Sequence, residues 1–275
     1  MSEIVRISRA ALHYGEENCI SGTRGSGTIF FSGCVLGCLF CQNYSVSHEG
    51  LGENISIERL ADIFKELEAK GAHNINLVTG THFAKRIVKA LDIYKPAVPI
   101  VWNCGGYESA ETLQVLNGYV DVYLPDYKYC DNELGLKFSK VPDYADKVIP
   151  AIAEMLHQVG TPVLDENGMI QKGVIIRHLV LPLHIRNTKQ VLTDIKERFP
   201  DAWVSVLLQY TPVREIKEYP ELNRRLTARE IEKVRSIVYE LNFENGYLQE
   251  PESATADMIP DFAKLEGVLS GTSER

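Results

Sequence analysis

The chain has 275 residues, of which 45% are hydrophobic and 24% charged, and its formal net charge is −8. These proportions are those of an ordinary globular protein, and the length allows one large α/β domain with a substantial core. The negative charge and the lack of a basic tract argue against nonspecific binding to nucleic acid. No membrane span or signal peptide is predicted, so we expect a cytoplasmic protein in a reducing compartment.

Short apolar runs alternate with helical patterns along the chain, which is typical of parallel strands joined by crossover helices. Six strands are predicted, at residues 28–31, 74–79, 98–102, 120–124, 173–181 and 203–210. Helices are predicted at residues 57–67, 82–94, 108–116 and 144–159, and one more begins at Thr227. Ser56 and the Thr-Ala-Arg-Glu sequence that ends at Glu230 are N-terminal capping signals.

The predicted fold class is α/β, a partial TIM-like (β/α)6 barrel, because six repeats are too few for the eight of a complete barrel. Chemistry in such folds lies on the loops after the strands, where polar and glycine-rich residues collect here. We expect one domain over residues 1–275, with an N-terminal extension of about 1–27 and a C-terminal tail of about 250–275. Residues 128–143 and 163–172 are expected to form a loop and a hairpin turn over the barrel mouth.

Three of the six cysteines, Cys34, Cys38 and Cys41, follow the first predicted strand in the pattern CxxxCxxC. Three thiolates at this spacing can hold one face of an iron-sulfur cube and leave its fourth iron without a protein ligand. A cubane that only transfers electrons normally has four cysteines. The pattern therefore indicates a cluster whose open iron binds a small molecule.

Other uses of these cysteines fit less well. A zinc site usually has four ligands, and the nearest spare one is His48. A disulfide framework needs a much higher cysteine density than six in 275 residues. Cys19, Cys104 and Cys130 are scattered and are expected to be small buried side chains.

The sequence resembles a known family in residues 25–44, 76–79, 121–128, 176–182 and 209–212. It is similar to the radical S-adenosylmethionine (radical SAM) proteins related to pyruvate formate-lyase activating enzyme, and more narrowly to the PflX-like branch. The resemblance covers essentially the whole chain and implies the radical SAM type of partial barrel. It also implies one [4Fe-4S] cluster on Cys34, Cys38 and Cys41. S-adenosylmethionine (SAM) would be cleaved reductively there to a 5'-deoxyadenosyl radical that abstracts hydrogen from a substrate.

The resemblance implies contacts to SAM as well. Lys128 would neutralise the carboxylate of the cofactor, and Asp126 would accept a hydrogen bond from its amine or ribose. The backbone carbonyls of Thr79 and Gly80 would contact the amine. Relatives carry a glutamate after this strand, whereas this chain has His82, which either starts a helix or touches substrate.

Three further positions leave alternatives open. Asn103 stands where relatives contact the ribose, and the Gly105-Gly106 pair after it is either a close approach to the ligand or a plain turn. Phe40 is expected beside the cluster or over adenine, with a core phenylalanine as the alternative. Arg177 lies inside an apolar strand and needs a buried partner. It is expected to act with Lys128 in catalysis and SAM binding, or else to form an internal salt bridge to a loop carboxylate.

The expected partners are an electron donor such as flavodoxin or ferredoxin and, by the activating-enzyme resemblance, a glycyl radical protein as substrate. A radical SAM enzyme acting on a small molecule is an alternative. Two further alternatives are an iron-sulfur electron-relay protein without SAM chemistry and a zinc-stabilised scaffold. No binding to nucleic acid or membrane is expected.

Overall fold

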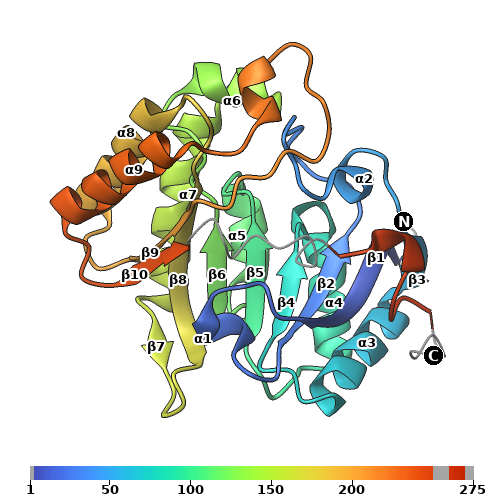
Figure 1. Ribbon diagram of the computed structural model, residues 1–275. Helices are drawn as coiled ribbons and strands as arrows, with labels where there is room; N and C mark the ends of the chain where they lie inside the picture. The colour runs from blue at the N-terminus through green and yellow to red at the C-terminus, as the bar shows by residue number, and fades with distance from the viewer. Residues whose placement is uncertain (1–2, 250–259, 270–275) are drawn as a thin grey trace.

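The computed structural model describes residues 3–249 and 260–269 (Figure 1). Its centre is a sheet in the strand order β10-β9-β8-β6-β5-β4-β2-β1-β3, with β7 paired to β8. The strands are β1 (Ile4–His13), β2 (Ser26–Phe31), β3 (Glu53–Ser56), β4 (Ile75–Val78), β5 (Ile100–Cys104), β6 (Val122–Pro125), β7 (Val163–Leu164), β8 (Ile170–Leu179), β9 (Trp203–Leu207) and β10 (Gly246–Gln249). From β2 to β10 neighbouring strands in this order are parallel, while β1 is antiparallel to both β2 and β3. The end strands β10 and β3 do not pair within the described residues, so the barrel is open.

Helices connect the parallel strands and bury their apolar faces on the sheet. The α-helices are α1 (Asn18–Ser21), α2 (Tyr44–Ser47), α3 (Ile57–Ala69), α4 (Ala84–Ile93), α5 (Ala110–Leu116), α6 (Asn132–Ser139), α7 (Tyr144–Val159), α8 (Ile185–Arg198) and α9 (Ala228–Leu241). Short 3-10 helices are η1 (Thr81–Phe83), η2 (Pro220–Asn223) and η5 (Phe262–Lys264). None of the helices that the structure describes is long and apolar enough to cross a membrane.

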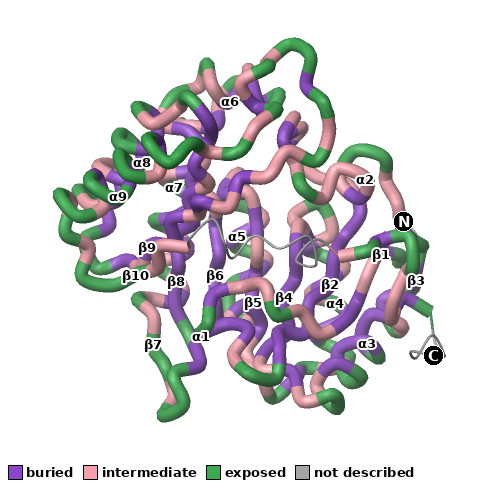
Figure 2. The backbone as a smooth tube through the Cα atoms, in the orientation of Figure 1, coloured by how far each residue is buried: buried purple, intermediate pink, exposed green. Residues whose placement is uncertain are grey.

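The two faces of the sheet bury different residues, because successive side chains of a strand point to opposite sides. Leu77 and Trp102 pack into the large core that also holds residues of α3 and α4. Val101 and Leu124 face the other way and pack with Ile20 of α1. Figure 1 shows α1 lying across this inner face, and Figure 2 shows the central strands buried along their length. The N-terminal segment thus occupies the inside of the open barrel.

The predicted fold class is confirmed, and the six predicted strands correspond to β2, β4, β5, β6, β8 and β9. The capping box at Thr227 and Glu230 begins α9 as expected, and residues 163–172 form a hairpin in which β7 pairs with β8. Residues 128–143, predicted as a loop, instead contain α6. The helix was missed because Gly135 interrupts its short apolar pattern, although Asp131 caps it by accepting a hydrogen bond from the Leu134 N–H.

Several other elements were not predicted. The residues expected as an N-terminal extension hold β1 and α1, and α8 and β10 also lie where no element was expected. Of the predicted C-terminal tail, residues 260–269 pack against β1, where Glu266 pairs with Arg9 and Val268 is buried. Residues 250–259 and 270–275 lie outside the described residues.

Candidate active site at the cysteine loop

The three motif cysteines lie in the loop that follows β2, at the C-terminal end of the parallel strands. All six cysteines of the chain are free thiols. The Leu36 N–H donates to Cys34 Sγ at 3.4 Å, and the Ser47 hydroxyl donates to Cys41 Sγ at 3.3 Å. Cys38 is buried, and its Sγ lies 2.9 Å from the hydroxyl of Ser139 in α6. Each thiol therefore has a hydrogen-bond partner, of the kind that tunes iron-sulfur clusters.

The thiols also interact with one another electrostatically. Burial and, after it, the neighbouring thiols Cys38 and Cys41 raise the pKa of the Cys34 thiol to about 12. Burial likewise raises the pKa of Cys38, while the Lys128 charge acts in the opposite direction. Thiols with raised pKa values become thiolates only when a cation compensates them, as a bound metal does.

The number and kind of donor groups fit an iron-sulfur cube. In residues 3–249 and 260–269, no three His, Cys, Asp or Glu side chains converge as ligands of one metal ion. In an iron-sulfur cube each thiolate binds a different iron, so three thiolates leave the fourth iron open. The donor set, three free thiols in one loop, fits the cube.

Two other segments fix the path of the cysteine loop. The Gly37 N–H donates to Ser139 O at 2.8 Å and the Leu39 N–H donates to Phe138 O at 2.9 Å, so the end of α6 runs alongside the loop. From the segment after β9, Arg214 Nε donates to Leu39 O at 3.2 Å. The residues expected to form a loop over the mouth therefore support the cysteines directly.

Asp126 and Lys128 follow β6 and form an ion pair in which Lys128 Nζ donates to Asp126 Oδ2. Burial lowers the pKa of Lys128, but the Asp126 carboxylate and the Cys38 thiol raise it by more, so the lysine stays charged. The Tyr144 hydroxyl lies 2.7 Å from Asp126 O and 2.9 Å from Gly105 O, and accepts from the Lys128 N–H at 3.0 Å. Backbone hydrogen bonds thus hold the Asp-x-Lys segment in place, and Lys128 is close enough to interact electrostatically with Cys38.

Thr79, directly after β4, has a φ of +61°, in the left-handed region. A β-branched residue is an outlier there, and such strain concentrates at functional sites. Its N–H donates to Asn103 O at 2.9 Å, which ties the ends of β4 and β5 together. Gly80 is buried, and a Cβ there would lie 2.7 Å from Ile87 Cδ1. The backbone at Thr79 is therefore held in an unusual conformation at the strand end, and Gly80 has no room for a side chain.

The residues around this turn have structural partners. His82 lies in η1, and its Nε2 is 2.8 Å from Ser32 O, just before the cysteines. Thr81 donates to the buried Glu108 at 2.7 Å, and burial raises the pKa of that carboxyl group. At Gly106, φ is +75° and a Cβ would lie 2.1 Å from Asp126 O, so the glycine is required by the neighbouring backbone.

Phe40 is buried in the main core, and its ring meets Tyr210 edge-on at 6.2 Å between centroids. This contact joins the cysteine loop to the segment after β9. Both predicted settings, the cluster side and the core, remain compatible with this position.

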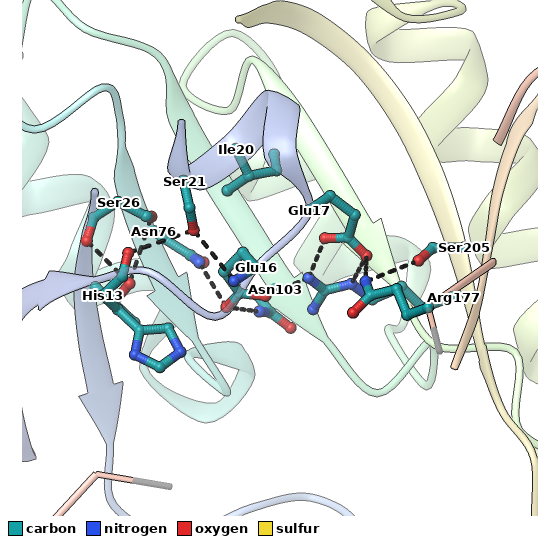
Figure 3. A network of polar contacts seen from close by, with 12 residues as sticks. His13, Glu16, Glu17, Ile20, Ser21, Ser26, Asn76, Asn103, Arg177 and Ser205 are labelled. Carbon is teal, nitrogen blue, oxygen red and sulfur yellow. Dashed lines mark hydrogen bonds and ion pairs between the residues drawn. The ribbon is translucent and has the colours of Figure 1, made fainter. Parts of the chain in front are cut away.

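Arg177 of β8 pairs with two carboxylates of the N-terminal segment, which the sequence left as the alternative to SAM binding. Its Nη2 donates to Glu16 and Glu17, and its Nε donates to Glu17 Oε1 at 3.0 Å (Figure 3). Glu16 Oε1 also accepts from Asn76 at 3.1 Å and from Asn103 at 3.3 Å. The side chain of Glu16 thereby joins β4, β5 and β8 on the inner face. Sequence reasoning missed Glu16 and Glu17, since two adjacent acids carry no motif.

The predicted site residues therefore gather around one end of the sheet. Lys128 interacts electrostatically with Cys34 and Cys38. The backbones of Asp126 and Arg177 pair in a parallel β-bridge. Arg177 contacts Glu16, which is bonded to Asn103. A continuous series of polar neighbours runs from the cysteines to the inner face.

Sequence comparisons find related proteins. A profile of the Radical SAM superfamily matches residues 28–182. The uncharacterized protein MJ0674 of Methanocaldococcus jannaschii is 35% identical over 248 residues, which cover 86% of this chain and 68% of that protein.

Solved structures share the fold at low identity. SuiB of Streptococcus suis, bound to S-adenosylmethionine, matches with a TM-score of 0.54 at 14% identity, over 82% of this chain and 50% of the SuiB chain. Methylornithine synthase (PylB) matches with a TM-score of 0.52 at 18% identity, over 86% of this chain and 67% of its own. This chain thus spans about half the length of SuiB.

Proposed function

The chain belongs to the radical SAM superfamily, and from this premise we propose that it is an enzyme that cleaves S-adenosylmethionine reductively at a single [4Fe-4S] cluster. The observation that carries the proposal is the position of Lys128. A largely buried, charged lysine interacts electrostatically with Cys34 and Cys38 at the end of β6. The electron-relay alternative gives this cation no ligand to bind.

In this proposal Cys34, Cys38 and Cys41 hold three irons, and the hydrogen bonds to their sulfurs adjust the potential of the cluster. When bound, the cluster and SAM supply the electron transfer that breaks a carbon-sulfur bond and gives a 5'-deoxyadenosyl radical for hydrogen abstraction. The protein supplies binding and orientation. Ser47 and Ser139 donate to or contact two of the sulfurs and so belong to the support of the cluster.

Lys128 would bind the carboxylate of SAM through a charge-assisted hydrogen bond, and Asp126 would accept from its amine or ribose. The strained backbone at Thr79 and Gly80 would present carbonyl groups to the amine. Asn103 is assigned to the ribose.

Two further residues have indirect roles in this assignment. Phe40 forms an apolar wall next to the cluster together with Tyr210. We propose that Arg177, already paired with Glu16 and Glu17, acts from the second layer by fixing Asp126 and Asn103.

The subtype proposed is activating-enzyme-like, in the PflX-like branch, and it rests on the motifs at the strand ends. By the activating-enzyme resemblance, the substrate proposed is a glycine of a partner protein and the electron donor is a flavodoxin or ferredoxin. A small-molecule substrate is the second candidate.

The test is anaerobic reconstitution of the full chain with iron and sulfide, followed by incubation with SAM and a strong reductant. We expect slow formation of 5'-deoxyadenosine and methionine, and none without reductant. The Cys38→Ala protein is the matched control and should form neither product. If a sample that contains a reduced cubane and bound SAM makes no 5'-deoxyadenosine, the enzyme proposal fails in favour of the electron relay.

A glycyl radical partner would accelerate turnover and acquire a persistent radical signal in electron paramagnetic resonance spectra. A small-molecule substrate would accelerate turnover without leaving that signal. The two candidates are thereby separated in the same assay.

A further inference from the structure

The two carboxylates that meet Arg177 are not equivalent. Glu17 has a side chain with no exposed surface, and it accepts from Arg177 Nε and Nη2 and from Gln249 at 3.2 Å. Burial raises the pKa of Glu17, but the charge and hydrogen bonds of Arg177 lower it by more, so it remains ionised. Glu17 and Arg177 together form a complete, buried ion pair.

Glu16 is the second carboxylate on the same guanidinium. Its side chain keeps 12% of its surface exposed, and it faces the amide groups of Asn76 and Asn103 (Figure 3). Neither amide carries a charge. Glu16 therefore has hydrogen bonds but no cation of its own.

The charges on this inner face do not balance. Asp126 pairs with Lys128 and Glu17 pairs with Arg177, which leaves Glu16 as one carboxylate in excess. His13 lies close enough to interact with Glu16, but burial lowers its pKa and keeps it neutral at neutral pH. Arg9, the other nearby cation, is paired with Glu266. Two largely buried carboxylates that share one guanidinium leave one negative charge uncompensated, which is costly, so the imbalance calls for a positive ligand.

A second observation points to a ligand at the same place. Asn76 is fully buried, and its Oδ1 has no hydrogen-bond partner in the part of the chain that the structure describes, while its Nδ2 donates to Glu16. A buried polar atom without a partner is rare in folded proteins. The layer that contains Glu16 thus lacks both a positive charge and a hydrogen-bond donor.

We propose that Glu16 makes the site selective for a sulfonium cation over the neutral thioether that corresponds to it. This inference rests on the proposed function. SAM carries an ammonium, a sulfonium and a carboxylate, so its net charge is positive. S-adenosylhomocysteine differs by one methyl group and by the loss of the sulfonium charge. The excess carboxylate would be neutralised by the first ligand and left uncompensated by the second.

The position of Glu16 supports this role. It is bonded to Asn103, the residue assigned to the ribose, and to Arg177, which is bridged to Asp126. The sulfonium of SAM is next to its ribose, so a charge beside the ribose-binding residue interacts with the sulfonium in a medium of low dielectric constant. Glu16 is thereby a specificity-determining residue rather than a ligand of the cluster.

The test is a comparison of dissociation constants for SAM and S-adenosylhomocysteine, measured by anaerobic calorimetry on reconstituted protein with an oxidised cluster, so that no cleavage occurs. The ratio of the two constants is the readout, because general damage to the site weakens both ligands together. In Glu16→Gln we expect the preference for SAM to fall about tenfold, as for one unit charge about 10 Å away at the effective dielectric of a protein. Glu16→Asp keeps the charge and should keep the preference even if both ligands bind more weakly.

Glu16→Ala is a second neutral variant, because a glutamine amide would direct a donor at Arg177 and could unfold the segment. The matched control is Glu108→Gln, at a buried glutamate between β5 and α5 that accepts a hydrogen bond from Thr81. It should leave the ratio unchanged. An unchanged ratio in both neutral Glu16 variants, or an equal fall in Glu108→Gln, would overturn the inference. In either case the parent protein still binds and cleaves SAM, whereas failure of the proposed function appears as a parent that makes no 5'-deoxyadenosine.

Discussion

The Nδ1 atom of His178 lies 2.7 Å from the backbone oxygen of Tyr127, the residue between Asp126 and Lys128. Its Nε2 lies 3.0 Å from the hydroxyl of Thr188 in α8. Because a carbonyl can only accept, Nδ1 donates to it. Burial lowers the pKa of His178, so the ring is neutral and Nε2 accepts from the Thr188 hydroxyl. One buried histidine of β8 therefore anchors the Asp-x-Lys segment of β6.

This anchor predicts a loss of stability in acid. Burial lowers the pKa of His178 from 6.5 to about 4. The folded state favours the neutral ring, so the contribution of His178 to the free energy of unfolding is fully present above pH 6.5. It is lost as the pH falls from about 6.5 toward about 4, and the loss amounts to about 3 kcal/mol. Denaturant unfolding of the apo protein across this range measures it.

His178→Asn should be less stable at pH 7 and should have a flatter pH dependence between those limits. His157→Asn, at an exposed position of α7, is the control and should follow the parent curve. Equal slopes for the parent and His178→Asn would show that His178 does not titrate as described.

Replacing any one of Cys34, Cys38 or Cys41 by alanine should abolish the cluster, because three irons depend on these thiolates. Iron content and the visible absorption spectrum after anaerobic reconstitution measure it. A protein with Cys19, Cys104 and Cys130 all replaced by alanine should keep about four irons per chain, as one cubane requires. About eight irons in the parent, or loss of the cluster in the triple variant, would contradict a single site.

Lys128→Ala should keep the cluster and weaken SAM binding by roughly tenfold to a hundredfold, the cost of about 1.5 to 3 kcal/mol for a lost charge-assisted contact. The variant also leaves Asp126 without its partner, so binding is compared at equal cluster content. Lys147→Ala, on the exposed side of α7, should bind as the parent does. If Lys128→Ala binds SAM as tightly as the parent, Lys128 does not contact SAM.

Thr79→Gly should relieve the positive φ of 61° at that position. We expect the free energy of unfolding to rise by about 1 kcal/mol, since glycine adopts this conformation without a Cβ clash. SAM affinity should fall by about threefold, because a glycine no longer holds the adjacent carbonyl groups in one orientation.

Asn242→Gly is the matched control, at the left-handed cap of α9 and away from the cysteine loop. It should change stability only. If Thr79→Gly is less stable than the parent, or binds SAM equally well, the backbone strain at Thr79 does not contribute to SAM binding.

Much of the fold follows from short-range patterns. Short apolar runs located β2, β4, β5, β6, β8 and β9, because a strand that is buried on both faces is mostly apolar along its length. The spacing of Cys34, Cys38 and Cys41 is equally local, since one loop carries all three. Asp126 and Lys128 could be predicted at the same end of the sheet as the cysteine loop, because the C-terminal ends of parallel strands lie together.

The sequence by itself thus determined the parallel sheet, the cysteine loop and the edge of the sheet on which polar residues meet. The tertiary structure alone decided how Arg177 is used. Its partners Glu16 and Glu17 lie about 160 residues away in the chain, on a segment whose path across the inner face depends on β1 pairing with β2. An ion pair of this kind has no periodicity or spacing, because it is set by where two distant backbones cross. For the same reason only the folded chain reveals that Glu16 is the carboxylate in excess.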